Sequence, residues 1–112
     1  MSKWDKTYFV QDQLDPSKIN GLLDLADEMN SNQMKQYSIK YKIPLGITDP
    51  DGNNLIHKIL RNDLHSEIIK LNVIKFLVNN GVSPDSPNSD NVTPLHLASE
   101  NQLTNIIKYL LD

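Results

Sequence analysis

Thr93-Pro94-Leu95-His96-Leu97-Ala98 is the most informative hexapeptide of the 112-residue chain. Proline suits the first turn of a helix because its missing N–H would have no partner there, and the preceding Thr93 is a good N-cap. We therefore predict a helix that begins at Pro94 and turns Leu95 and Ala98 inward, with Leu97 as a further candidate for the same face. The small Ala98 side chain would let a second helix pack closely.

A second apolar pattern follows after a short turn. Its residues recur at helical spacing and form one stripe, made of Ile106, Ile107, Leu110 and Leu111. Residues 88–112 are thus predicted to form a helix pair.

The same arrangement occurs once more upstream. His57, at the end of Asp51-Gly52-Asn53-Asn54-Leu55-Ile56-His57, lies 39 residues before His96. An apolar pattern again follows, from Val73 to Val78, and Gly81 after it is typical of a C-cap in the left-handed conformation. Two copies at such a spacing indicate a repeat architecture.

The second copy resembles the ankyrin repeat, because residues 93–98 match that family's T-P-L-H-x-A signature and keep its spacing to the apolar stripe. The first copy is degenerate, since Asn54-Leu55-Ile56 stands where the signature has Thr-Pro-Leu. It keeps Asp49, Gly52 and His57, and Gly81 is the family's loop glycine. The resemblance covers residues 49–112. It implies an all-α fold, a short solenoid of antiparallel helix pairs.

The spacing of 39 exceeds the family's period of about 33 residues, and the excess falls between Leu60 and Val73. Ser66 and Glu67 can start a helix there. One apolar face would then include Ile69, Val73, Phe76 and Leu77. We interpret residues 48–87 as a repeat with a lengthened outer helix and a longer turn.

The first 47 residues lack the signature. Asp15 and Pro16 predict a helix start. Two helical patterns follow before Pro44 and Gly46, one with Ile19, Leu22, Leu23, Ala26 and Met29 and one with Met34, Tyr37 and Tyr41. We interpret residues 15–47 as an N-terminal helical capping unit or degenerate repeat. Residues 1–14 are interpreted as an arm, whose aromatic side chains either pack on this cap or bind a partner.

The composition excludes several classes of protein. Eleven basic against fourteen acidic residues give a net charge of −3, which argues against nucleic-acid and membrane-surface binding. No cysteine is present for a disulfide or a thiolate site, and no apolar run is long enough for a membrane span. The start of the chain does not resemble a signal peptide. We therefore expect a reducing, cytoplasmic location.

No catalytic or metal-binding constellation emerges. The resemblance implies that His57 and His96 form hydrogen bonds to backbone in the neighbouring turn, and no further ligands are spaced for a metal. His65 lies in the polar insertion and is expected to be solvated. The sequence contains no phosphate loop or nucleophile motif. We expect no enzyme activity and no cofactor.

The surface that the resemblance marks for binding is the concave face, made of the hairpin tips and the exposed side of the inner helices. Carried over by position, the candidates in the first repeat are Pro50, Asp51, Asn53, Arg61 and Asn62. Those in the second repeat are Ser89, Asp90, Val92, Glu100 and Asn101. The set is polar and slightly acidic, so a partner with a basic or hydrogen-bonding surface would suit it.

Two kinds of function fit these features. The first is a non-enzymatic module that binds a partner protein through the concave face. The alternative is a structural or assembly component of a virion or larger complex, since residues 97–110 are also similar to ankyrin repeats of giant DNA viruses. In both cases the flank beyond the last helix is expected to contact a further repeat, a partner or a second copy, because solenoid ends are normally polar. The repeat at 88–112 is therefore either truncated or complete as it stands.

Overall fold

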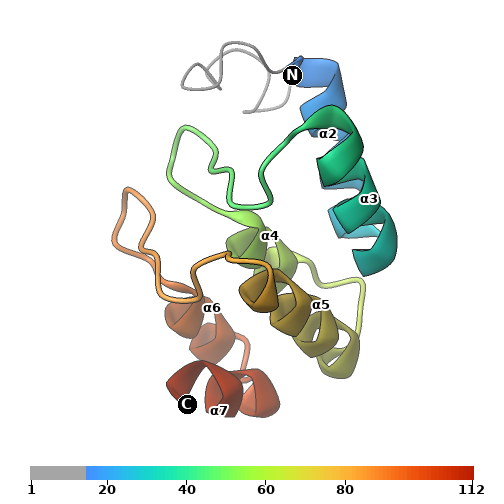
Figure 1. Cartoon of the computed structure of the whole chain (residues 1–112). Coiled ribbons are helices and arrows are strands. Elements are labelled where there is room, and N and C mark those ends of the chain that lie inside the picture. The colour runs from blue at the N-terminus through green and yellow to red at the C-terminus, as the bar shows by residue number, and fades with distance from the viewer. Residues whose placement is uncertain (1–14) are drawn as a thin grey trace.

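The structure is a computed structural model that describes residues 15–112 (Figure 1), and the arm expected at residues 1–14 lies outside the described residues. The described part is all-helical. The helices are α2 (Pro16–Asp27), α3 (Ser31–Tyr41), α4 (Leu55–Arg61), α5 (Glu67–Asn79), α6 (Pro94–Glu100) and α7 (Thr104–Leu111).

The helices form three antiparallel pairs that stack along the molecule. α2 packs on α3, α4 on α5 and α6 on α7, while α2, α4 and α6 form a continuous inner layer. In the outer layer α5 packs on α7. The predicted solenoid of helix pairs is therefore confirmed, and its core runs through all three pairs, from Ile19 in α2 to Ile106 in α7.

The N-terminal pair begins where the sequence predicts. The Asp15 side chain accepts a hydrogen bond from the Ser17 backbone N–H at 2.9 Å and caps α2. Gly21 has a packing role that sequence reasoning missed, because a Cβ there would overlap the Tyr37 hydroxyl of α3. Met29 was expected on the apolar face of α2, but it lies beyond the helix end with φ 57°.

The two inner helices α4 and α6 start with the same hydrogen-bonding pattern. Asn54 and Thr93 are their N-caps, and each side chain accepts from the backbone N–H of the histidine three residues later. That histidine, His57 or His96, accepts in return from the backbone N–H of the cap residue. Both helices thus carry a capping box, so the degenerate first copy keeps the geometry of the second although its cap is Asn rather than Thr.

The buried face of the outer helix α5 differs in part from the one expected. Ile69 was placed on the apolar face by its spacing, but it is exposed, and Lys70 and Leu71 are buried in its place. The reason is that α5 packs against both α4 and α7, so two neighbouring helices determine which residues are covered. Val73 and Leu77 are buried as expected.

A carboxylate of α5 caps the next outer helix. α7 has no side-chain cap of its own at Leu103. The Glu67 carboxylate instead accepts hydrogen bonds from the backbone N–H groups of Asn105 at 2.7 Å and Ile106 at 3.2 Å. A negative charge at a helix N-terminus is favourable because the first N–H groups have no partner within the helix.

Removing this charge should loosen the last helix. We expect Glu67→Gln to reduce stability by about 0.5–1 kcal/mol and to accelerate hydrogen exchange at the Asn105 and Ile106 amides. Glu28→Gln, at the exposed end of α2, is the matched control and should leave these amides unchanged. Equal exchange in the two variants would show that Glu67 does not cap α7.

Candidate functional site

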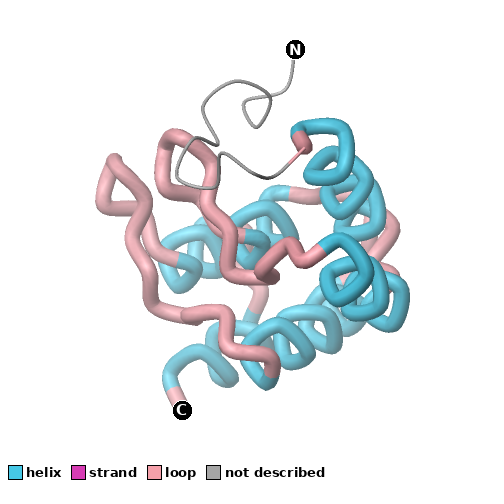
Figure 2. Tube along the Cα trace, turned by 45° about the horizontal axis from the view of Figure 1, so that its top comes forward, coloured by secondary structure: helices cyan, strands magenta, loops and turns pink. Residues whose placement is uncertain are grey.

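Two loops project in the same direction from the inner helices (Figure 2), and they are built alike. In the first loop, residues 48–53, the Asp49 carboxylate accepts from the backbone N–H groups of Asp51 and Asn53, both at 2.9 Å. In the second loop, residues 87–92, the Asn88 side-chain oxygen accepts from Asp90 at 2.8 Å and Val92 at 3.0 Å. Sequence reasoning named Asp49 only as a residue that the first copy keeps from the family pattern, and it missed Asn88, although an Asn or Asp side chain that bonds to the backbone two residues on is a known turn signal.

The two loops are also bonded to each other. The Ser89 backbone N–H donates to the Asp51 carbonyl oxygen at 2.8 Å. The Asn88 side-chain amide donates to Asn53 Oδ1 at 2.9 Å, and Arg61 donates to the same oxygen at 3.0 Å. The tips are thus held in fixed register along the stack.

These contacts correct one expectation for the concave face. Asn53 was predicted to be a surface contact, but it is only 6% exposed and its oxygen already accepts two hydrogen bonds. Val92 and Asn62 are half-buried, and Val92 packs against the core. The other predicted residues are exposed: Pro50, Asp51, Arg61, Ser89, Asp90, Glu100 and Asn101.

The buried side chain of His57 connects the first repeat to the loop of the second repeat. Its Nδ1 accepts from the Asn54 backbone N–H at 3.1 Å, so the ring proton is on Nε2, which donates to the Val92 carbonyl oxygen at 2.9 Å. The residue is fully buried, and burial lowers its pKa below the ordinary value of 6.5. Arg61 nearby adds to this lowering, while the Val92 hydrogen bond opposes it.

This lowered pKa predicts acid sensitivity. Well above pH 6.5 the imidazole is neutral in both the folded and the unfolded chain, and its contribution to stability is complete. Below that pH the unfolded chain binds a proton that the folded chain excludes. Stability from this group therefore falls as the pH drops toward the folded-state pKa, by up to about 1.4 kcal/mol per pH unit. Urea unfolding between pH 7 and 5 should show a shallower loss in His57→Gln than in His96→Gln, and equal slopes would contradict the assignment.

His96 differs from His57 because no further repeat lies against it within residues 15–112. Its ring completes the capping box of α6 but is exposed, and within residues 15–112 no acceptor faces Nε2. The apolar residues of this flank are likewise less covered than their counterparts in the preceding repeat. Leu95 was expected to point inward, yet it is only half-buried, whereas its counterpart Ile56 in the preceding repeat is fully buried.

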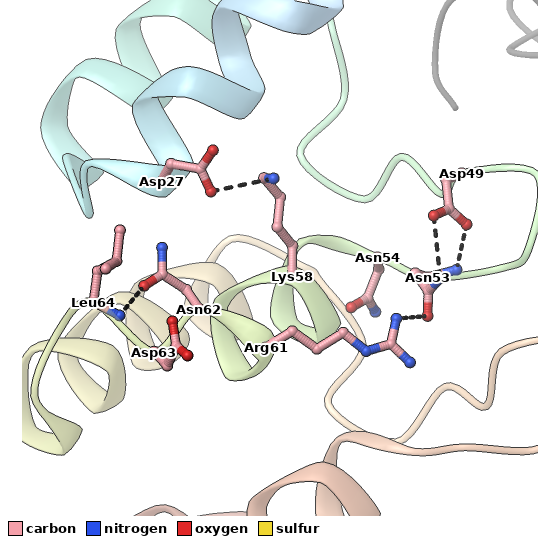
Figure 3. A pocket seen from close by; sticks show the side chains of 9 residues that line it. All are labelled: Asp27, Asp49, Asn53, Asn54, Lys58, Arg61, Asn62, Asp63 and Leu64. Carbon is pink, nitrogen blue, oxygen red and sulfur yellow. Dashed lines mark hydrogen bonds and ion pairs between the residues drawn. The ribbon is translucent and has the colours of Figure 1, made fainter. Parts of the chain in front are cut away.

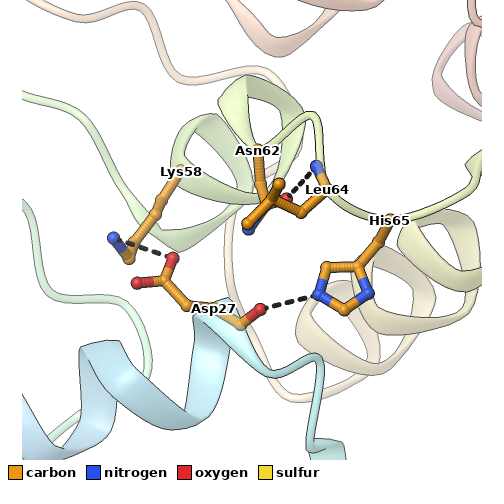
Figure 4. A network of polar contacts seen from close by, with 5 residues as sticks. All are labelled: Asp27, Lys58, Asn62, Leu64 and His65. Carbon is orange, nitrogen blue, oxygen red and sulfur yellow. Dashed lines mark hydrogen bonds and ion pairs between the residues drawn. The ribbon is translucent and has the colours of Figure 1, made fainter.

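A polar pocket of about 370 Å³ lies on the concave face between α2, α4 and the first loop (Figure 3). Lys58 and Arg61 line it from α4, and Asp27 from the end of α2 forms an ion pair with Lys58 at 3.2 Å. His65 was expected to be solvated, but its Nε2 is 3.0 Å from the Asp27 backbone carbonyl and ties the insertion to α2 (Figure 4).

Metal sites and membrane-spanning helices find no support among the described residues. Among residues 15–112 no three side chains of His, Asp or Glu come together as metal ligands. None of the helices in this range is both long and apolar enough to cross a bilayer.

Stacked helix pairs with hydrogen-bonded loops on one side define a helical-repeat protein. A family model for ankyrin repeats, three copies, matches residues 22–112, and the chain belongs to the ankyrin-repeat family. A relative from Acanthamoeba polyphaga mimivirus, named as an ankyrin repeat protein, is 38% identical over 80 residues. The match covers 68% of this chain and 4% of that relative, so the chain spans a small part of its length. No solved structure gives a significant match.

Proposed function

We propose that this chain is a non-enzymatic module that binds a partner protein across its concave face. Ankyrin repeats are in general protein–protein interaction modules, and no group of side chains that could hold a metal ion lies within the described residues. The observation that carries the proposal is the pair of loops fixed to each other by the Ser89–Asp51 and Asn88–Asn53 hydrogen bonds. A preorganised surface loses little entropy when a partner binds.

The exposed charges of this face suggest the chemistry of the partner. Asp51, Asp90 and Glu100 are acidic and exposed, and Arg61 is the one cation among the exposed residues of the predicted set. Opposite charges across an interface raise association rates and select the partner. The proposed partner therefore presents a basic, hydrogen-bonding surface.

A matched pair of charge variants tests this proposal. The double variant Asp90→Asn/Glu100→Gln removes two negative charges from the concave face, and Asn72→Lys/Asn79→Lys adds two positive charges on exposed positions of α5. In quantitative affinity capture, the first variant should bind at least about tenfold less partner than wild type does. The second variant should bind as much as wild type. Equal retention would overturn the assignment of the face.

Sedimentation of the same variants distinguishes this proposal from the alternative, a structural or assembly component. The half-buried Leu95, Ile107 and Leu110 of the last repeat favour a contact on its C-terminal flank. Such a component would sediment as a multimer, and its self-association would depend on this flank and be insensitive to the Asp90 and Glu100 substitutions.

A further inference from the structure

The connection between α4 and α5 is two residues longer than the corresponding connection of the last repeat, and it forms one wall of the concave pocket. Residues 62–66 join these helices, whereas residues 101–103 join α6 and α7. Asn62, Asp63 and Leu64 of the longer connection line the pocket together with the ion pair of Asp27 and Lys58 (Figure 3). The longer connection therefore contributes three of the residues that line the pocket.

This wall is held in place at both ends. The Asn62 side-chain oxygen accepts from the Leu64 backbone N–H at 2.8 Å, and His65 bonds to the Asp27 carbonyl oxygen (Figure 4). Between these anchors Leu64 is 84% exposed, the most exposed of the large apolar side chains of residues 15–112. An apolar side chain held out at the rim of a pocket has no role in the core.

The charged residues of the pocket differ in whether they have a hydrogen-bond or ion-pair partner within residues 15–112. Lys58 is neutralised by Asp27, and Asp49 accepts hydrogen bonds from the first loop. The exposed Asp63 carboxylate receives no hydrogen bond or ion pair from residues 15–112. The lining contains three carboxylates and two cations, so it has an excess of negative charge.

We propose that this pocket receives a lysine or arginine side chain of the partner, with an adjacent large apolar residue packed on Leu64. This assignment rests on the proposed function and specifies the partner segment as a basic residue next to an apolar one. Asp63 would supply the counter-charge, and the volume of about 370 Å³ accommodates a long side chain.

Defined dipeptides test the assignment without knowledge of the partner. The probe is acetyl-Leu-Arg-amide, titrated into the full chain while the amide NMR signals of Asn62, Asp63 and Leu64 are followed. Saturable shifts with millimolar half-saturation are expected, and acetyl-Leu-Glu-amide should bind at least about fivefold more weakly. Equal binding of both probes, or no saturable shift with either, would overturn the proposal. Tighter binding of the Glu probe would also overturn it and would indicate an anionic partner group at Arg61.

Surface variants complete the test. Leu64→Ser and Asp63→Asn should each weaken the Leu-Arg probe about fivefold. Leu111→Ser and Asp85→Asn change an exposed leucine and an exposed aspartate away from the pocket, and both should bind as wild type. If the pocket variants bound the Leu-Arg probe with wild-type affinity, the assignment would be contradicted. If it fails while capture still depends on Asp90 and Glu100, only the pocket is wrong and the proposed function stands.

Discussion

Leu77→Ala is expected to reduce the free energy of unfolding by about 2–5 kcal/mol, whereas Leu110→Ala should cost about half as much or less. The two leucines occupy equivalent positions in α5 and α7, within the similar runs Ile74-Lys75-Phe76-Leu77 and Ile107-Lys108-Tyr109-Leu110. Leu77 is 0% exposed in α5, which packs against both α4 and α7, whereas Leu110 is only half-buried. The same truncation therefore leaves a cavity in one repeat and a shallow surface dent in the other.

Urea unfolding monitored by circular dichroism measures the difference, provided that the slope with denaturant is unchanged. Equal losses for the two variants would mean that the flank of the last repeat is covered in solution. Sedimentation of the wild-type chain would then show whether a second copy provides that cover.

The second large effect is expected at Gly52, where alanine should cost about 2 kcal/mol or more. Its φ of +82° is unfavourable for a residue with a side chain, by roughly 1–2 kcal/mol. An added Cβ would also lie 3.1 Å from the Asn88 Cα and 3.2 Å from the Ser89 nitrogen. Backbone atoms cannot rotate away, so the two loops would have to separate.

Variants at two other glycines distinguish the cost of the backbone strain from the cost of the close approach of the added Cβ. Gly81 has φ +93° but open space around its Cβ position, so Gly81→Ala should cost only the backbone strain, about 1 kcal/mol. Gly46 has open space and no left-handed φ, and Gly46→Ala should be close to neutral. Thermal unfolding of the three variants should rank them in this order. If Gly52→Ala and Gly81→Ala were equal, the close approach of the loops would be disproved.

Local sequence predicts well where helices of this chain begin and how they pair. Thr93 and Pro94 mark the start of α6, and Asp15 and Pro16 mark the start of α2, because caps depend on bonds between residues two or three positions apart. The face of α5 could not be predicted in this way. Apolar residues surround much of that helix, so periodicity alone does not decide between Ile69 and Leu71.

The candidate site was predictable only in part for a similar reason. The position of Asp90 on an exposed tip follows from the family pattern. The burial of Asn53 depends on a partner, Asn88, that is 35 residues away. The bond from His65 to Asp27 spans 38 residues. No local rule connects residues at such separations, and in this chain the insertion changes the spacing on which the family pattern relies.

The contacts of His57 and Glu67 have a consequence for synthesis on the ribosome. His57 forms a hydrogen bond to the loop that precedes α6, and Glu67 accepts one from the first turn of α7. Both helices of the last repeat are thus bound at their N-terminal ends by residues that are synthesised earlier. We expect the nascent chain to assemble in the direction of translation, because α4 and α5 emerge first and present both groups as a template. The last repeat can then dock as soon as it leaves the exit tunnel.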